Sequence, residues 1–173
     1  GNHGIVYRDA DGEFVLPEPN LKGAHQIYNA GTAVAALRQW DKTRFGLENF
    51  VSGVTKANWP GRLQHLKTGV LQTSLPKGIE LWVDGGHNPA AGAALANAIE
   101  AWNDAPVVLI CAMQKNKDIV GFLAPLAAKS SRVIGIDLLG IPTGHSPEKI
   151  ATVAAGFGVQ SETAGSLEEA VKK

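Results

Sequence analysis

The residues whose types and spacing best suit chemistry form one short segment, Asp84–Pro89, which reads Asp-Gly-Gly-His-Asn-Pro. It begins where the apolar run Ile79–Asp84 predicts the end of a strand. In open α/β sheets, ligands bind outside the carboxyl ends of strands. A carboxylate at that edge, Asp84, can accept hydrogen bonds from both hydroxyls of a ribose, and the glycines allow close approach to the backbone. His87 stands just before a helix N-terminus, where unpaired N–H groups favour anions.

Two further polar residues are candidates for binding a ligand. Asn29 lies near the start of an alanine-rich helix predicted over His25–Trp40, and its amide has the donor and acceptor that suit a purine edge. Arg62 follows Ala57–Gly61, a predicted interdomain hinge, and its guanidinium can reach a nucleotide phosphate. Plainer alternatives remain open. Asp84 can cap nearby N–H groups, Asn29 can face solvent on a capped helix, and Arg62 can be a solvated linker residue.

Several signatures of nucleotide and metal chemistry are missing from the sequence. It contains no G-x-x-x-x-G-K-[ST] phosphate loop, and no G-x-G-x-x-G follows the first strand of the predicted sheet. The five histidines are scattered without the spacing of metal ligands, and no Ser–His–Asp set can be argued from spacing. We therefore expect that this chain alone cannot complete a phosphoryl transfer.

The elements that must position these residues alternate from Ile79 onward. Repeated β–α units predict an α/β fold, an open and mostly parallel (Rossmann-like) sheet with helices on both faces. The proline inside the second helix weakens that helix or implies a kink. The predicted strands are Ile79–Asp84, Pro106–Met113, Arg132–Asp137 and Val159–Thr163, and the predicted helices run from Asn88 to about Trp102, over Asp118–Lys129, from Ser146 and from Leu167.

The first sixty residues differ from the rest. They predict a hairpin around Asp11-Gly12, the helix His25–Trp40 and a short helix over Leu47–Val54. We place a domain boundary between residues 57 and 58. Residues 1–57 are too few to form a stable domain alone, so we expect them to be the tail of a missing domain. The lone methionine is internal and the last helix lacks a terminator, which favours a piece of a longer polypeptide.

Composition narrows the classes of function. Lys+Arg and Asp+Glu both number 16, so charge gives no support for binding nucleic acid or an acidic membrane. The single cysteine, Cys111, lies in an apolar run and predicts a buried thiol in a reduced, cytoplasmic protein. No run approaches the roughly 18 apolar residues of a membrane span.

Several short segments, taken in their order along the chain, resemble the bacterial folylpolyglutamate synthase/dihydrofolate synthase family of the Mur ligase superfamily. The resemblance covers nearly the whole chain, although Gly86 stands where the family usually has alanine. The family's N-terminal ATPase domain, with its phosphate loop and magnesium ligands, is not in this sequence. The matching phrases are Leu16-Pro17 with Leu21–Ala30, then Trp59–Gln64, then Val83–Pro89 and, more weakly, Met113–Ile119.

The resemblance implies an ATP-dependent ligase that adds L-glutamate to dihydropteroate, to folates or to both through an acyl phosphate. It makes Asn29, Arg62 and Asp84 the ATP-contacting positions of this half of the enzyme, and places His87 near the incoming glutamate or the transferred phosphate. It also implies Mg²⁺ held by the N-terminal domain, closure about a hinge at residues 57–61, and a monomer. We expect the isolated chain to lack ligase activity.

Two alternatives remain open. Within the superfamily, a cell-wall Mur ligase or a cyanophycin-type synthetase would share the fold, but the phrases Leu-x-Gly-x-His-Gln and Trp-Pro-Gly-Arg favour the folate branch. Outside it, the chain could be a non-catalytic nucleotide- or partner-binding α/β module. A native start codon near Gly1 would favour the module, and an upstream reading frame encoding a phosphate loop would favour the ligase.

Overall fold

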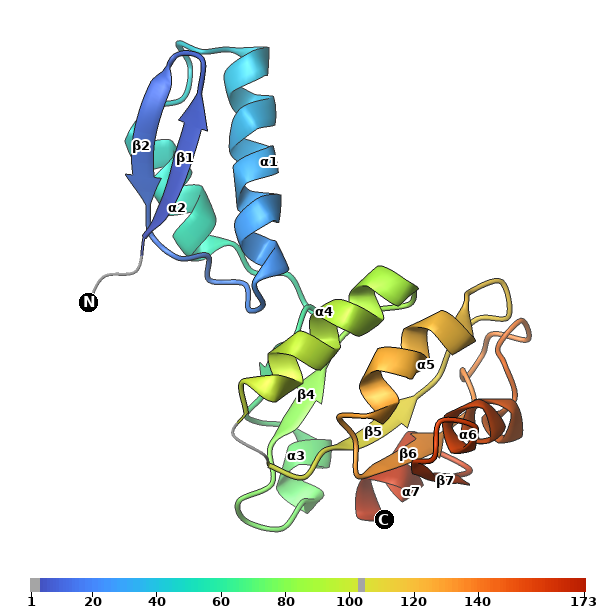
Figure 1. Ribbon diagram of the computed structural model, residues 1–173. Helices are drawn as coiled ribbons and strands as arrows, with labels where there is room; N and C mark the ends of the chain where they lie inside the picture. Colours follow the sequence, from blue (N-terminus) through green and yellow to red (C-terminus); the bar gives the residue numbers. More distant parts are fainter. Residues whose placement is uncertain (1–3, 103–104) are drawn as a thin grey trace. The chain divides into compact units, whose positions relative to one another are not determined.

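A computed structural model describes residues 4–102 and 105–173, and the chain divides into two compact units (Figure 1). Unit 1 ends at Gln64 and unit 2 begins at His65, a few residues beyond the boundary expected between residues 57 and 58. Within the described ranges, no helix is both long and apolar enough to cross a membrane.

The described part of unit 1 consists of a hairpin and two helices (Figure 1). The strands pair antiparallel around a turn in which Gly12 has a φ of +135°, a value that residues with a β-carbon rarely adopt. The predicted hairpin and long helix are confirmed. The elements are β1 (Ile5–Asp9), β2 (Gly12–Leu16), α1 (His25–Trp40) and α2 (Leu47–Lys56).

The core of unit 1 lies between the hairpin and its helices. Leu16 is fully buried, and Phe14 stacks on Phe50 of α2 with ring centroids 5.7 Å apart. Val15, which lies between Phe14 and Leu16 along β2, is exposed, because successive side chains of a strand point to opposite faces. Helix α1 contributes Val34 to the same core.

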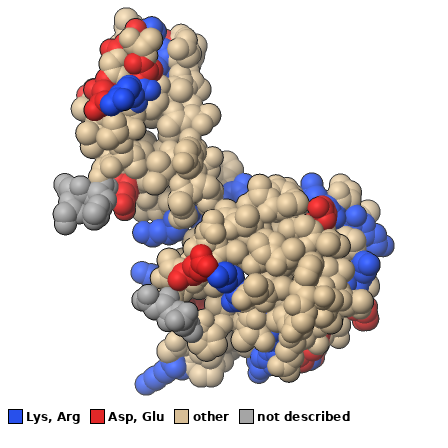
Figure 2. All heavy atoms as spheres, in the orientation of Figure 1, with Lys and Arg blue, Asp and Glu red and all other residues tan. Residues whose placement is uncertain are grey.

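Charged side chains of both signs gather at the turn end of the hairpin (Figure 2). Arg38 of α1 donates from Nε to Asp9 Oδ2 across 2.6 Å, and Lys42 contacts Asp11. These pairs fasten the C-terminal end of α1 to the hairpin turn.

Unit 2 contains a parallel sheet and the helices that cover it. Strands β5 (Val108–Cys111), β6 (Arg132–Gly135) and β7 (Gln160–Thr163) pair in parallel in that order. Two shorter strands, β3 (Gln64–Leu66) and β4 (Leu81–Val83), form a separate sheet. The helices are α3 (Val70–Ser74), α4 (Pro89–Glu100), α5 (Ile119–Ala127), α6 (Pro147–Ala155) and α7 (Leu167–Lys172).

The parallel sheet is covered on both faces. In β6, Val133 and Ile134 are both fully buried, and as neighbours along a strand they point to opposite faces. Val133 belongs to the core formed with α4, α5 and α6, whereas Ile134 packs with Ala164 and with Ala170 of α7. The fold is therefore α/β, an open parallel sheet with helices on both faces, as the sequence predicts.

Helices α4 and α5 cross at close range. A β-carbon on Gly92 would lie 2.3 Å from the carbonyl oxygen of Phe122, and one on Gly121 would lie 2.7 Å from Pro89 Cγ. Because protein interiors are close-packed, larger side chains at these glycines would push the helices apart. The crossing therefore fixes the start of α4, and with it the segment Asp84–Pro89.

The structure departs from the predicted elements in two places. The sequence analysis missed β3 and α3, which are too short to show a periodic pattern. Strand β4 is shorter than the predicted Ile79–Asp84, and it pairs with β3 rather than with β5. The helix predicted over Asp118–Lys129 is confirmed as α5, which runs through Pro125 to Ala127 because a proline near a helix end removes few backbone hydrogen bonds.

Candidate functional site

Asp84 shapes the turn that follows β4. Its Oδ1 accepts a hydrogen bond from the backbone N–H of Gly86 across 2.6 Å, and the residue is partly buried. A β-carbon on Gly86 would lie 2.9 Å from that same oxygen and 3.1 Å from Ala91 Cβ. Asp84 therefore caps a backbone N–H group of its own turn, which is the plainer of the two roles predicted for it. Any contact with a ligand would be a second role of the same carboxylate.

His87 lies on the exposed side of the same turn. Its Nδ1 is 2.9 Å from the carbonyl oxygen of Gly85. Because a carbonyl only accepts, Nδ1 carries the proton in this contact, and Nε2 is then the acceptor of the neutral ring. Asn88 follows as the N-cap of α4, accepting from the backbone N–H of Ala91 at 2.9 Å, with Pro89 in the first helical position. The turn thus presents an imidazole beside a helix N-terminus.

Asn29 is oriented by its neighbours on α1. Its Nδ2 donates to Gln26 Oε1 across 3.0 Å, and Gln26 in turn lies 3.0 Å from the Nε2 of His25. Gln26 is the buried member of this chain, with 5% exposure, whereas Asn29 is exposed. Asn29 also lines a mostly apolar cavity of about 220 Å³ between α1 and α2. The buried and hydrogen-bonded amide of Gln26 thus fixes the orientation of the exposed amide of Asn29.

Arg62 lies in a structured turn rather than in a featureless linker. Gly61 before it has a φ of +70° and donates its N–H to Gln64 Oε1 at 2.9 Å. Leu63 after it has a φ of 42°, a conformation that is unfavourable for a residue with a β-carbon, yet its side chain is buried. Burial of Leu63 holds this backbone in place, and it leaves the neighbouring Arg62 exposed.

The structure brings some of the predicted site residues together. Asp84 and His87 share one turn of unit 2, whereas Asn29 and Arg62 belong to unit 1. Within the described ranges, no three His, Cys, Asp or Glu side chains are grouped so as to hold a metal ion.

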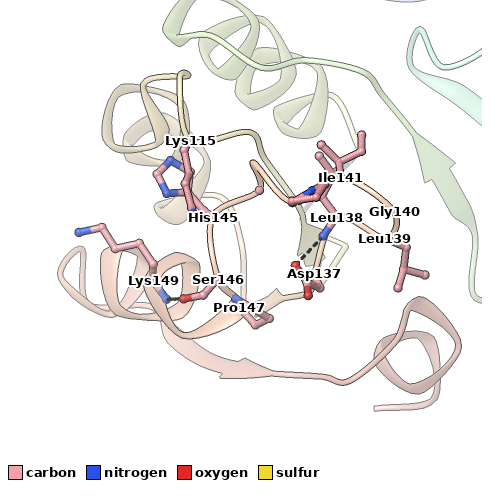
Figure 3. Close-up of a pocket in the computed structure, with 12 residues that line it drawn as sticks. Lys115, Asp137, Leu138, Leu139, Gly140, Ile141, His145, Ser146, Pro147 and Lys149 are labelled. Atoms are coloured by element: carbon pink, nitrogen blue, oxygen red, sulfur yellow. Dashed lines mark hydrogen bonds between the residues drawn. The ribbon is translucent and has the colours of Figure 1, made fainter.

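Sequence reasoning missed a second concave site, which lies at the carboxyl ends of β5 and β6 (Figure 3). It has a volume of about 900 Å³. Lys115 and His145 lie on one side of it in the view of Figure 3, and the loop from Asp137 to Ile141 lies on the other. The sequence did hold one signal for this pocket, because the turns that follow two neighbouring parallel strands meet at one edge of the sheet. We call it the β5–β6 pocket.

Residues 61–173 match the family "Mur ligase, glutamate ligase domain". The chain belongs to this Mur ligase family. The match covers the described elements of unit 2, including the Asp84–Pro89 turn and the β5–β6 pocket, and it begins just before Arg62.

Relatives of this Mur ligase family chain include folylpolyglutamate synthases. The chain is 28% identical over 169 residues to a probable bifunctional folylpolyglutamate synthase/dihydropteroate synthase of Haloferax volcanii, covering 95% of this chain and 18% of that protein. The structure of E. coli FolC in complex with DHPP and ADP is 27% identical, with a TM-score of 0.78 over 99% of this chain and 37% of FolC. A bifunctional folylpolyglutamate synthase/dihydrofolate synthase with Mn, AMPPNP and L-glutamate bound is 26% identical, with a TM-score of 0.75 over 95% of this chain and 36% of that one.

The chain thus spans less than two fifths of these solved relatives and less than a fifth of the Haloferax protein. The homology to folylpolyglutamate synthases predicted from the sequence is confirmed over this region, and the family and relatives that it matches are named as ligases or synthases.

Proposed function

We propose that this chain is the C-terminal part of an ATP-dependent ligase that joins L-glutamate to dihydropteroate, to folates or to both. The observation that supports it most is the match of residues 61–173 to a glutamate ligase domain, in a chain that aligns over 99% of its length with FolC solved with DHPP and ADP. Because the chain covers a minor part of FolC, the activity belongs to the complete polypeptide that contains it.

In this proposal, Asp84, Asn29 and Arg62 contact ATP. The carboxylate of Asp84 accepts hydrogen bonds from the ribose, and the amide of Asn29, oriented by Gln26, binds the purine edge. The exposed guanidinium of Arg62 pairs with a phosphate. Related enzymes solved with ADP or AMPPNP support a nucleotide in this family.

The reaction requires activation of a carboxylate, because its negative charge repels nucleophiles. ATP supplies a phosphoryl group that turns the carboxylate into an acyl phosphate, which the amine of L-glutamate then attacks with release of phosphate. His87, held by Gly85 through Nδ1, offers Nε2 as an acceptor to the ammonium group of the incoming glutamate or, when it is protonated there, as a donor to the transferred phosphate. The related enzyme solved with Mn supports a divalent ion, and in this proposal the ligands of that ion belong to the N-terminal domain of the complete polypeptide. Closure about residues 57–61 excludes water from the acyl phosphate.

The test is an ADP-release assay on the complete polypeptide. We expect ADP release that depends on L-glutamate with dihydropteroate or a folate, and none with a UDP-muramoyl substrate. Activity with the UDP-muramoyl substrate alone would instead identify a cell-wall ligase. No turnover with any acceptor would favour the non-catalytic module.

The 173-residue chain is the matched control in the same assay. It lacks a phosphate loop, so we expect no glutamate-dependent ADP release from it. Release at a rate comparable to that of the complete polypeptide would show that the chain carries the whole active site, contrary to the proposal.

A further inference from the structure

Three polar side chains in the first turns of α1 are joined by hydrogen bonds. Gln26 lies in the middle with 5% exposure, and the two ends of its amide meet different partners. Its Nε2 lies 3.0 Å from His25 Nε2, and its Oε1 accepts a hydrogen bond from Asn29 Nδ2 across 3.0 Å. Positions three or four residues apart share one side of a helix, so α1 itself brings these side chains together. We call His25, Gln26 and Asn29 the α1 relay.

The ring of His25 packs against Gly23, just before the helix. A β-carbon on Gly23 would lie 2.7 Å from His25 Cε1 and 2.9 Å from its Nδ1. Gly23 also has a φ of +107°, a conformation that favours glycine. The ring therefore occupies space that glycine leaves open, with Nε2 directed to Gln26 and the residue otherwise exposed.

The α1 relay has two self-consistent arrangements of donors and acceptors. Rotating the amides of Gln26 and Asn29 together preserves the bond between them, because each amide has a donor and an acceptor. The amide nitrogen of Gln26 only donates, so the arrangement in the structure places the proton of the neutral His25 ring on Nδ1 and leaves Nε2 as the acceptor. In the other arrangement, Gln26 Oε1 faces His25 and the proton lies on Nε2. A mixture of the two would set donor against donor beside a buried amide, which is costly.

The arrangement of the relay decides which atoms Asn29 offers to a ligand. In the structure, one N–H of Asn29 is used by Gln26, and Oδ1 has no partner among the described residues. Asn29 is exposed, so it offers an acceptor and one remaining donor. In the other arrangement Oδ1 accepts from Gln26, and Asn29 offers two N–H donors. The ring of His25 is thus coupled to an amide that it reaches only through Gln26.

We propose that His25 and Gln26 are positioning residues, which couple the tautomer of the His25 ring to the atoms that Asn29 presents. The consequence for nucleotides rests on the proposed function, in which Asn29 binds a purine edge. Asparagine pairs with a 6-aminopurine through its oxygen and one N–H, as the arrangement in the structure allows. A 6-oxo group accepts instead, so it favours the arrangement with two donors. A 6-aminopurine therefore keeps the His25 proton on Nδ1, and a 6-oxopurine moves it to Nε2.

The coupling is tested without a nucleotide, by long-range ¹H–¹⁵N spectra of the imidazole in the 173-residue chain at about pH 8, where histidine rings are neutral. We expect the parent chain to carry the His25 proton on Nδ1. Asn29→Asp, whose carboxylate only accepts, should turn Gln26 Nε2 toward position 29 and move the His25 proton to Nε2. Asn29→Leu, which removes the bond to Gln26, should give a mixture of tautomers. One tautomer in all three chains would overturn the proposal.

A second background separates the relay from the charge of the new carboxylate. Gln26→Met keeps the approximate size of the buried side chain and removes both of its hydrogen bonds. In this background, Asn29→Asp should leave the tautomer ratio of His25 unchanged. The same switch of tautomer would show that the carboxylate acts on the ring directly, and would refute the role of Gln26. Because Asn29 is exposed, its variants carry the test by themselves if Gln26→Met does not fold.

Nucleotide preference in the complete polypeptide tests the consequence for a ligand. Inosine triphosphate has the ribose and triphosphate of ATP with an oxygen at position 6, so the ratio of its KM to that of ATP reports on the base. We expect a ratio of at least about 10. His25→Gln, whose amide can still accept from Gln26, should retain this ratio, whereas His25→Lys, whose ammonium only donates, should lower it by about 5–10-fold. The added charge acts on both triphosphates alike.

The outcomes separate this inference from the proposed function. A ratio that His25→Lys leaves unchanged, in an enzyme that uses ATP, would overturn the inference and leave the proposed function intact. Absence of ATP turnover would refute the proposed function, and the His25 tautomer in the Asn29 variants would still decide whether the relay couples the two residues.

Discussion

Asp84 Oδ1 and the backbone N–H of Gly86 lie 2.6 Å apart, so the carboxylate proposed to bind ATP also closes its own turn. A substitution at Asp84 therefore changes two things at once, the geometry of the turn and the charge offered to a ligand. Asparagine separates them, because its side-chain oxygen can still accept from Gly86 while its charge is gone.

Asp84→Ala in the complete polypeptide should raise the KM for ATP more than the KM for the folate. In the 173-residue chain it should lower the free energy of unfolding by about 1 kcal/mol through loss of the cap. Asp84→Asn should stay close to the parent chain in stability and still raise the KM for ATP. Steady-state kinetics and urea titration measure the two effects. A larger rise in the KM for the folate would remove Asp84 from the nucleotide site.

Gly92→Ala should destabilise unit 2, because its β-carbon would lie 2.3 Å from the carbonyl oxygen of Phe122 and the helices cannot separate without loss of packing. Overpacking of this kind costs about 1–3 kcal/mol. The matched control is Gly31→Ala on α1, where no heavy atom beyond the adjacent backbone of the helix lies within 4 Å of the new β-carbon. There alanine should stabilise unit 1 by about 0.5–1 kcal/mol through helix propensity.

Native-state hydrogen exchange resolves the two units in these variants. Slowly exchanging amides of β5 and β6 should lose protection in Gly92→Ala, and those of α1 should gain it in Gly31→Ala. Unchanged protection of β5 and β6 would show that α4 and α5 can move apart at little cost.

The first residues of two helices could be predicted, because the sequence signals that start a helix are local. Asn88-Pro89 and Ser146-Pro147 each place a capping side chain before a proline, and both helices begin there in the structure. The apolar run Val108–Cys111 was equally visible, because a strand in a sheet covered on both faces is apolar throughout. Strand β3 could not be predicted, since three residues carry no period.

The β5–β6 pocket could not be predicted because it depends on contacts between distant residues. His145 reads in the sequence as one of several scattered histidines, and only its backbone bond to Met113 places it beside Lys115. The pairing of β4 with β3 likewise depends on contacts between residues that are distant in sequence, and strand propensity does not determine it.

Unit 1 should lose stability in acid through Asp9. The hydrogen bond from Arg38, with Nε 2.6 Å from Asp9 Oδ2, lowers the pKa of this carboxyl below its ordinary value of 3.8. A lowered folded-state pKa gives stability that is fully present above the unfolded pKa and is lost as the pH falls through the folded one. Asp9→Asn should therefore be less stable than the parent chain at pH 6, with the difference shrinking below about pH 4.

Urea titrations followed at unit 1 amides measure this difference. Glu13→Gln is the matched control, because the Glu13–Arg8 pair is exposed and should contribute little at any pH. A difference between Asp9→Asn and the parent chain that stays constant from pH 6 to pH 3 would contradict the assignment.

Cys111 should resist thiol reagents while unit 2 is folded. It retains 6% exposure at the end of β5, and burial raises the pKa of its thiol to about 12. Because the thiolate is the reactive species, the folded chain at pH 8 should react with an aromatic disulfide reagent far more slowly than the chain in urea. Labelling should then require unit 2 to open, so its rate should rise in Gly92→Ala and stay unchanged in Gly31→Ala. Rapid labelling of the folded parent chain would show that Cys111 is accessible.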